Sequence, residues 1–145
     1  MNAGTTMREI YCVYDEQESP DMRRHFLELF GYQVQSFRSG AECLAALEKR
    51  RPAVVILDVL IEGENGFEVC RAIRDRFTAD ELPVIVCSTI YRDELYHHAA
   101  IEAGAQRFVL RPIEADDLVE IVNDVVSARS SGVVPTISHT STRPS

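Results

Sequence analysis

The chain has 145 residues, enough for one domain with a hydrophobic core and too few for a large two-domain enzyme. Hydrophobic residues make up 46% and charged residues 26%, which is typical of a soluble globular protein and argues against a disordered or membrane-embedded chain. The net charge of -8 would repel a phosphate backbone and an acidic membrane surface, so we expect no direct nucleic-acid binding and no membrane binding.

The first strand and helix are marked by an apolar run and by two helix signals. Residues 9–14 form a short run rich in β-formers, which predicts a buried strand. Ser19 and Pro20 then supply a cap and a first-turn proline for a helix that ends at Gly31. A second strand is predicted at residues 33–37.

A capping box opens the next helix. Ser39 to Glu42 has the S-x-x-E form, and the helical pattern continues to Arg51-Pro52. Residues 54–57 are all aliphatic and mostly branched, which is typical of a strand covered by helices on both faces. Asp58 follows this strand, and a loop with two glycines comes after it.

The second half of the chain continues the alternation. Helices are predicted at 67–77, 93–103 and 114–130, with strands at 84–87 and 107–110 between them. Right-handed crossovers then give an α/β fold: a five-stranded parallel sheet flanked by five helices, a flavodoxin-like three-layer sandwich.

We expect one domain at 8–129, between an N-terminal extension at 1–7 and a Ser/Thr/Pro-rich tail or linker at 130–145. Four cysteines lack metal-binding spacing and are interpreted as reduced, buried thiols. No run approaches the roughly 20 apolar residues that cross a bilayer, so the expected location is the cytoplasm.

Polar residues follow the predicted strands, at the edge where parallel sheets bind ligands. If the first and third strands are neighbours, Asp15 and Asp58 converge, and two carboxylates so close need either a cation between them or a raised pKa. Oxygen ligands favour magnesium as that cation. Ser88 and Arg111 would complete a pocket for phosphoryl oxygens. A central carboxylate such as that of Asp58 can accept a phosphoryl group as an acyl phosphate.

Four segments resemble the response-regulator receiver domains (CheY-like) of bacterial two-component signalling. They are VYDE at 13–16, ILDVLIEGENGFEV at 56–69, PVIVCST at 83–89 and GAQRFVLRPI at 104–113. The third-strand segment and the segment ending in a basic residue and proline are together quite specific. The resemblance covers residues 8–128.

The resemblance implies that Asp58 is the phosphoacceptor for a histidine kinase or histidine phosphotransfer protein. Mg²⁺ (or Mn²⁺) would be held by Asp15, Asp58 and the backbone carbonyl of Leu60, with Glu16 as a further candidate ligand. Arg111 would supply the phosphoryl-contacting cation. The chain itself would be no enzyme, and any catalytic output would lie outside it.

The resemblance also implies a conformational switch. Ser88 would be the switch hydroxyl that moves to bond the phosphoryl group, and Phe108 the aromatic switch that turns inward with it. The surface of the fourth helix, fifth strand and last helix would then bind a downstream protein, a fused output domain or a second copy of the chain. The pair His97-His98 is interpreted as interface or solvent residues, because adjacent helical residues point about 100° apart.

Some positions depart from the family pattern. Tyr14 replaces the first of two adjacent acids, Arg111 replaces the usual lysine, and Thr89 replaces a small residue. Glu62 stands where proline is common, and Glu64 adds negative charge near the site. Each change predicts slower phosphorylation.

Two other functions remain open. The first is a pseudo-receiver, a binding module that acts as a protein-interaction domain without phosphorylation, for which Tyr14, Thr89 and Arg111 argue. The second is an enzyme on a flavodoxin-like or dehalogenase-like sheet. That reading is disfavoured because no glycine-rich phosphate loop follows the first strand, and Asp58 lacks a second Asp two residues on.

Overall fold

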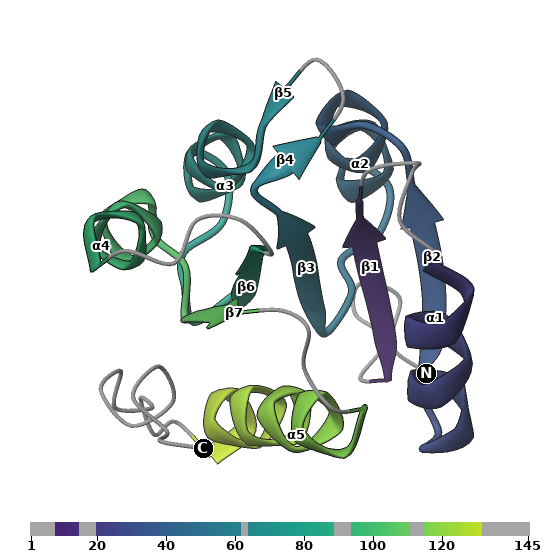
Figure 1. Cartoon of the computed structure of the whole chain (residues 1–145). Coiled ribbons are helices and arrows are strands. Elements are labelled where there is room, and N and C mark those ends of the chain that lie inside the picture. The colour runs from purple at the N-terminus through teal and green to yellow at the C-terminus, as the bar shows by residue number, and fades with distance from the viewer. Residues whose placement is uncertain (1–7, 15–19, 62–63, 89–93, 111–114, 132–145) are drawn as a thin grey trace.

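The computed structural model describes residues 8–14, 20–61, 64–88, 94–110 and 115–131 (Figure 1). The main sheet contains β1 (Glu9–Val13), β2 (Gln33–Phe37), β3 (Val54–Asp58), β6 (Val84–Ser88) and β7 (Arg107–Leu110). A hairpin follows β3 and contains β4 (Leu60–Ile61) and β5 (Glu64–Asn65). The helices are α1 (Pro20–Leu29), α2 (Gly40–Leu47), α3 (Gly66–Arg74), α4 (Glu94–Ala103) and α5 (Ala115–Ser131). None of these helices is both long and apolar enough to cross a bilayer within the described residues.

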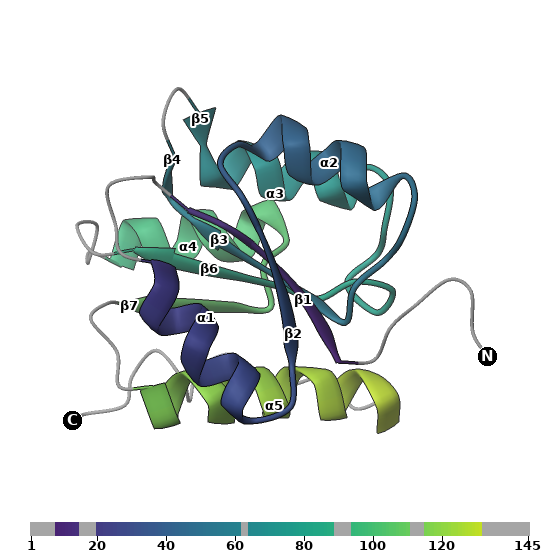
Figure 2. The same ribbon diagram turned by 90° about the vertical axis from the view of Figure 1, so that its right-hand side faces the viewer.

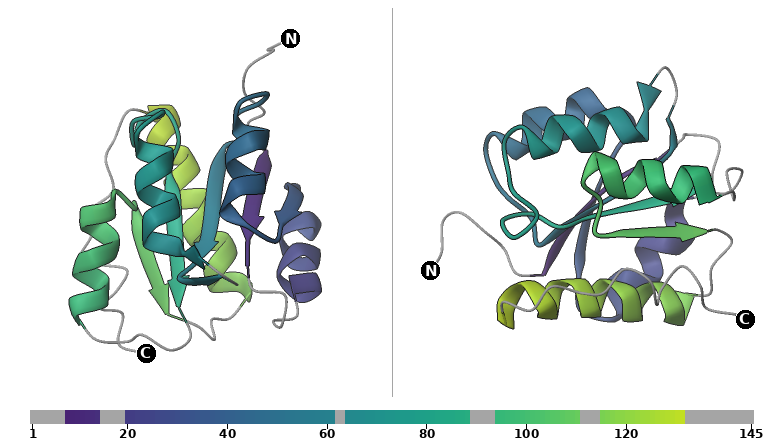
Figure 3. Two further views of the ribbon diagram at one scale, coloured as in Figure 1. Left: turned by 90° about the horizontal axis from the view of Figure 1, so that it is seen from above. Right: turned by 90° about the vertical axis from the view of Figure 1, so that its left-hand side faces the viewer.

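The predicted three-layer sandwich is confirmed. The strand order is β2-β1-β3-β6-β7, and all neighbouring strands are parallel. Helices α2, α3 and α4 cover one face of the sheet, and α1 and α5 cover the other (Figures 2 and 3). Because β1 and β3 are neighbours, the condition on which the predicted carboxylate pair depended is met.

The sheet separates two hydrophobic cores. Tyr11, Leu57 and Phe108 belong to the core under α2, α3 and α4, whereas Ile56 and Val109 belong to the core under α1 and α5. Every residue of β1, β3 and β6 is buried, because these strands are covered on both faces. This explains why their sequences are apolar except for one polar residue at an end of each strand.

Two predicted helices are wrong at their ends. The helix predicted to reach Arg51 ends at Leu47, where Glu48 N–H and Lys49 N–H donate to carbonyls three residues back and tighten the last turn. The helix predicted over 67–77 ends at Arg74. There the Arg74 side chain binds carbonyls of the following segment and turns the chain away from the helix axis. The β4–β5 hairpin lies where only a loop was predicted.

Helix caps are mostly as predicted. Ser39 Oγ accepts from Glu42 N–H at 3.1 Å, although the Glu42 carboxylate accepts from Arg38 N–H and not from Ser39 as a capping box would have it. Gly31 and Gly104 follow α1 and α4 with φ of 96° and 106°, the left-handed conformation that glycine adopts at low cost.

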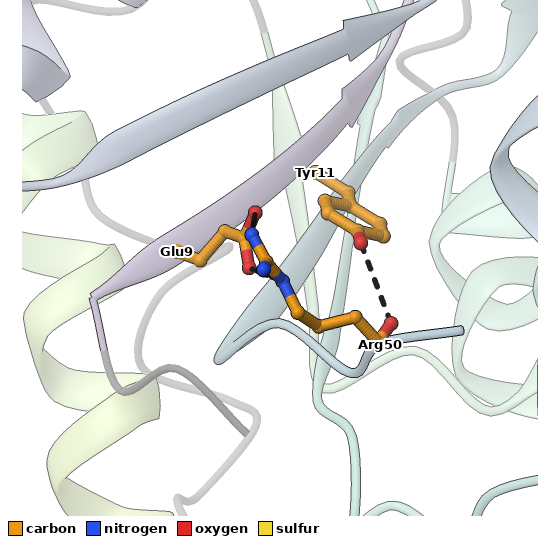
Figure 4. Close-up of polar contacts among 3 residues, drawn as sticks. All are labelled: Glu9, Tyr11 and Arg50. Atoms are coloured by element: carbon orange, nitrogen blue, oxygen red, sulfur yellow. Dashed lines mark hydrogen bonds and ion pairs between the residues drawn. The ribbon is translucent and has the colours of Figure 1, made fainter. Parts of the chain in front are cut away.

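Glu9, Tyr11 and Arg50 form a polar cluster at the start of β1 (Figure 4). Asp58 lies at the opposite end of the sheet. The carboxylate of Glu9, buried in the structure, accepts from Arg50 Nε at 3.0 Å and Nη2 at 3.1 Å. Tyr11 Oη donates to the Arg50 carbonyl at 3.3 Å, and burial raises the Tyr11 pKa, with the nearby Glu9 charge adding to the rise. The cluster therefore ties β1 to the segment after α2.

All four cysteines are buried and none is in a disulfide, as predicted. Burial raises the pKa of Cys43 to about 12 and that of Cys70 to about 11, from the 9.0 of a solvated thiol.

Because the unfolded chain ionises these thiols at a lower pH than the folded chain does, we expect the free energy of unfolding to fall as pH rises above 9. Below that pH these thiols add no pH dependence. Urea midpoints at about pH 8 and about pH 10 check this. A Cys43→Ala variant should lose part of the decrease, and equal midpoints in the parent would contradict the prediction.

Arg107 is a buried cation on the α5 side of β7, with 2% of its surface exposed. Its Nε and Nη1 have no acceptor among the described residues. Burial lowers the pKa of its guanidinium, and the charge of Asp124 on α5 opposes this. The side chain is therefore a charge that the fold buries at a net cost.

Replacement of Arg107 by methionine is expected to stabilise the protein by about 2 kcal/mol, because an apolar side chain of similar length has no charge to desolvate. Urea unfolding of the variant and parent measures the difference. The matched Asp124→Asn variant should be less stable than the parent, since it removes the facing carboxylate. A less stable Arg107→Met protein would show that the guanidinium contributes net stability.

Candidate functional site

Two buried polar side chains lie at the carboxyl edge of the sheet, Asp58 at the end of β3 and Ser88 at the end of β6. Their exposed fractions are 6% and 5%. Asp58 is opposite Cys87 in the pairing of β3 with β6, so Ser88 lies one position further along the neighbouring strand. Ser88 is in turn opposite Leu110, the last residue of β7. The structure thus brings the predicted phosphoacceptor and switch hydroxyl to one edge.

The backbone around Asp58 is held from both sides. Val59 N–H donates to the Cys87 carbonyl at 2.9 Å, and Gly66 N–H donates to the Val59 carbonyl at 2.8 Å. A Cβ atom on Gly66 would lie 2.2 Å from the Asp58 carbonyl oxygen, so only glycine fits there. Sequence reasoning found this glycine only as part of a loop and missed its contact with Asp58.

The β4–β5 hairpin carries Leu60 and Glu64. Leu60 is 43% exposed, and its backbone pairs with Asn65. Glu64 Oε1 accepts from Gly40 N–H at the first residue of α2, at 2.5 Å. The Glu64 charge, predicted only as negative charge near the site, therefore stabilises a helix N-terminus.

The predicted aromatic switch Phe108 is buried between the sheet and α4, with 3% exposed. The ring of His97 on α4 lies edge-on to it, with centroids 5.8 Å apart and an interplanar angle of 84°. His98 is exposed, as predicted, but His97 is partly buried. His97 shares the inward face of α4 with Ala100, three residues on, and its contact with Phe108 was not foreseen when the pair was interpreted as interface or solvent residues.

Of the remaining predicted residues, the structure describes Tyr14. Tyr14 is partly buried against the core under α1 and α5, and its N–H donates to the Phe37 carbonyl at 3.4 Å. The other residues lie outside the described residues: Asp15, Glu16, Glu62, Thr89 and Arg111.

The donor chemistry at this edge fits a hard cation. Its described donors are oxygen atoms, from the Asp58 carboxylate and the backbone carbonyls after it, which suits Mg²⁺ or Mn²⁺ better than a thiolate-binding metal. Within the described ranges no group of three or more His, Cys, Asp or Glu side chains is placed to hold a metal. Further carboxylates for such an ion would come from Asp15 or Glu16.

Comparisons with known proteins agree with this arrangement. Residues 10–123 match the family model described as the response regulator receiver domain. The chain is 37% identical over 101 residues to the transcriptional regulatory protein AfsQ1 of Streptomyces coelicolor, covering 67% of this chain and 43% of that protein. It is 29% identical over 129 residues to the phosphate regulon transcriptional regulatory protein PhoB of Rhizobium meliloti, covering 89% and 56%. The chain thus spans about half the length of these relatives.

A solved structure shares the whole fold. The chemotaxis response regulator CheY4 of Vibrio cholerae superimposes with a TM-score of 0.74 at 27% sequence identity, and the match covers 83% of this chain and 99% of that one.

Proposed function

Because the chain belongs to the family of response-regulator receiver domains of two-component systems, we propose that Asp58 accepts a phosphoryl group and that its modification switches a partner-binding surface. One observation carries the proposal: a buried carboxylate ends the central strand β3 beside the buried hydroxyl that ends β6. Burial shields this carboxylate from bulk water, and it ends its strand at the edge where parallel sheets bind ligands.

In the proposed step, a carboxylate oxygen of Asp58 attacks the phosphorus of a phosphohistidine on a histidine kinase or histidine phosphotransfer protein. The P–N bond breaks, a P–O bond forms, and the leaving imidazole takes a proton from solvent. Mg²⁺ (or Mn²⁺), held by Asp15, Asp58 and the Leu60 carbonyl with Glu16 as a further candidate, would neutralise charge on the phosphoryl oxygens.

Residues around Asp58 would then bind the phosphoryl group and respond to its negative charge. The Ser88 hydroxyl donates to a phosphoryl oxygen, and the Arg111 guanidinium contacts another. Movement of Ser88 changes the packing of Phe108, which lies two residues before Leu110 on the adjacent strand. Phosphorylation thereby shifts the population between two packings of α4, β7 and α5.

Response regulators act through kinases and output domains, and receiver domains are signalling domains. For this chain we place the receiver at 8–129 in the cytoplasm, with α4, β7 and α5 contacting a downstream protein, a fused output domain or a second copy. The relatives are named transcriptional regulators, so a fused DNA-binding unit would supply the nucleic-acid contact that we do not expect from this acidic chain itself.

The test is direct. The purified chain is incubated with magnesium and acetyl phosphate and its intact mass is measured, and amide NMR shifts are recorded with beryllofluoride. We expect the mass of one phosphoryl group to be gained, and saturable shifts at Asp58, Ser88 and Phe108. An Asp58→Asn variant should show neither. No mass gain and no shift at millimolar magnesium would refute phosphorylation and favour the pseudo-receiver.

A further inference from the structure

Two aromatic contacts join helix α4 to α3 and to β7. Its buried side chains among the described residues are only the alanines Ala100 and Ala103, which bury little surface. Two consecutive residues make the larger contacts: the Tyr96 ring stacks on Phe67 of α3, with centroids 6.5 Å apart and an interplanar angle of 16°, and His97 contacts Phe108. These two ring pairs therefore position α4 together with the packing of Ala100 and Ala103 and the hydrogen bond from Cys70 Sγ to the Ala103 carbonyl.

Phe67 is joined to Asp58 through the backbone. Gly66 packs directly on the Asp58 carbonyl and the Val59 Cα, and it is hydrogen-bonded to Val59. The next residue, Phe67, is fixed by a 2.7 Å bond from its N–H to Asn65 Oδ1 and is 8% exposed. Because this segment is close-packed backbone against backbone, a shift of Asp58 and Val59 has to move Gly66 and Phe67 with it.

We propose that Tyr96 is a positioning residue that couples the Asp58 segment to α4 through Phe67, by a route separate from Phe108 and His97. The inference rests on the proposed function, since it concerns how the phosphorylated state reaches α4. The contact from Phe67 reaches α4 at Tyr96, and the contact from Phe108 reaches it at the next residue, His97. A change at Asp58 therefore acts on α4 from the α3 side as well as from the β7 side.

The alanines of α4 provide the probes for a test. The full chain is labelled with ¹³C-methyl alanine, which reports on Ala99, Ala100 and Ala103, and spectra are recorded in magnesium with and without beryllofluoride. In Tyr96→Leu the stacked ring is lost while an apolar side chain remains. We expect the beryllofluoride-induced shifts of these methyls to fall by at least about half, with the amide shifts of Asp58 and Ser88 unchanged.

Matched variants separate coupling from simple loss of packing. Tyr96→Phe keeps the ring and should retain the parental response, and Leu95→Ala changes the 76% exposed neighbour and should do the same. Phe67→Leu should reduce the α4 response as Tyr96→Leu does, and the double variant should reduce it no further.

The two failures are distinguishable. If the parent shows no shift at Asp58 and Ser88, the proposed function fails and the coupling fails with it. If Asp58 and Ser88 respond and the α4 methyls of Tyr96→Leu and Phe67→Leu shift as in the parent, only the coupling is overturned.

Discussion

Replacing Arg74 with methionine is expected to lower the free energy of unfolding by about 3 kcal/mol. Arg74 is the last residue of α3, and its Nε donates to the Gly104 carbonyl at 2.8 Å. Nη1 donates to the Leu82 carbonyl at 2.7 Å, and Nη2 to Gln106 Oε1 at 3.2 Å. Methionine replaces much of the volume but supplies no donor, so these carbonyls would lose their partners in a partly buried site.

Arg76 offers a matched control. It lies two residues further along the chain, is 42% exposed, and pairs with Glu48 at 3.2 Å on the surface. Arg76→Met should cost less than about 1 kcal/mol, because solvent screens an exposed ion pair. Urea unfolding of the two variants measures the contrast. Similar losses would mean that the Arg74 bonds contribute no more than a surface contact.

The second large effect is expected at Gly66. An alanine methyl there would lie 2.2 Å from the Asp58 carbonyl oxygen and 2.9 Å from the Val59 Cα. Both are backbone atoms, so no side-chain rotation relieves the overlap and the β3–α3 segment has to move. We expect Gly66→Ala to cost about 3 kcal/mol of stability. Since the displaced atoms include Asp58, phosphorylation by acetyl phosphate should also slow by about ten-fold or more.

Gly40→Ala is the comparison for this variant. The new methyl would meet the side chains of Val69 and Glu64 and no backbone atom among its three nearest neighbours, so adjustment of side chains can absorb part of the overlap. We expect a smaller loss of stability and a phosphorylation rate near the parental one. Equal rates for Gly66→Ala and the parent would show that Asp58 does not depend on the contact with Gly66.

The main elements of the fold were predictable because each carries its own local pattern. The aliphatic run of β3 suits only a strand covered on both faces, and the alternation of such runs with helical stripes leaves few topologies. The features that were not predicted depend on distant residues or are too short to carry a pattern. The end of α3 involves the Arg74 side chain, which binds the Leu82 carbonyl eight residues on and the Gly104 carbonyl 30 residues away. The β4–β5 strands have two residues each, too few for any periodicity.

The site was predictable to the same degree. Asp58 and Ser88 end apolar runs, and the rule that parallel strands place their carboxyl ends together brings them to one edge. The contact of His97 with Phe108 was not predicted because two adjacent histidines look equivalent until the inward face of α4 is known. The structure gives the positions of Asp58, Ser88 and Phe108, and the functional roles of all the site residues stay predictions: Asp15, Glu16, Asp58, Leu60, Ser88, Phe108 and Arg111.

The contacts at the start of β1 bear on how far the chain can be shortened. Arg8 donates to the carbonyls of Phe30 at 2.9 Å and Gly31 at 3.1 Å, and its guanidinium lies over the ring of Tyr32. The next residue, Glu9, forms an ion pair with Arg50. A truncated gene product that started at Ile10 would keep Asp58 and Ser88 and still lose the contacts with the segment after α1 and with the segment after α2. We therefore expect a chain that starts at Ile10 to be less stable than one that starts at Arg8.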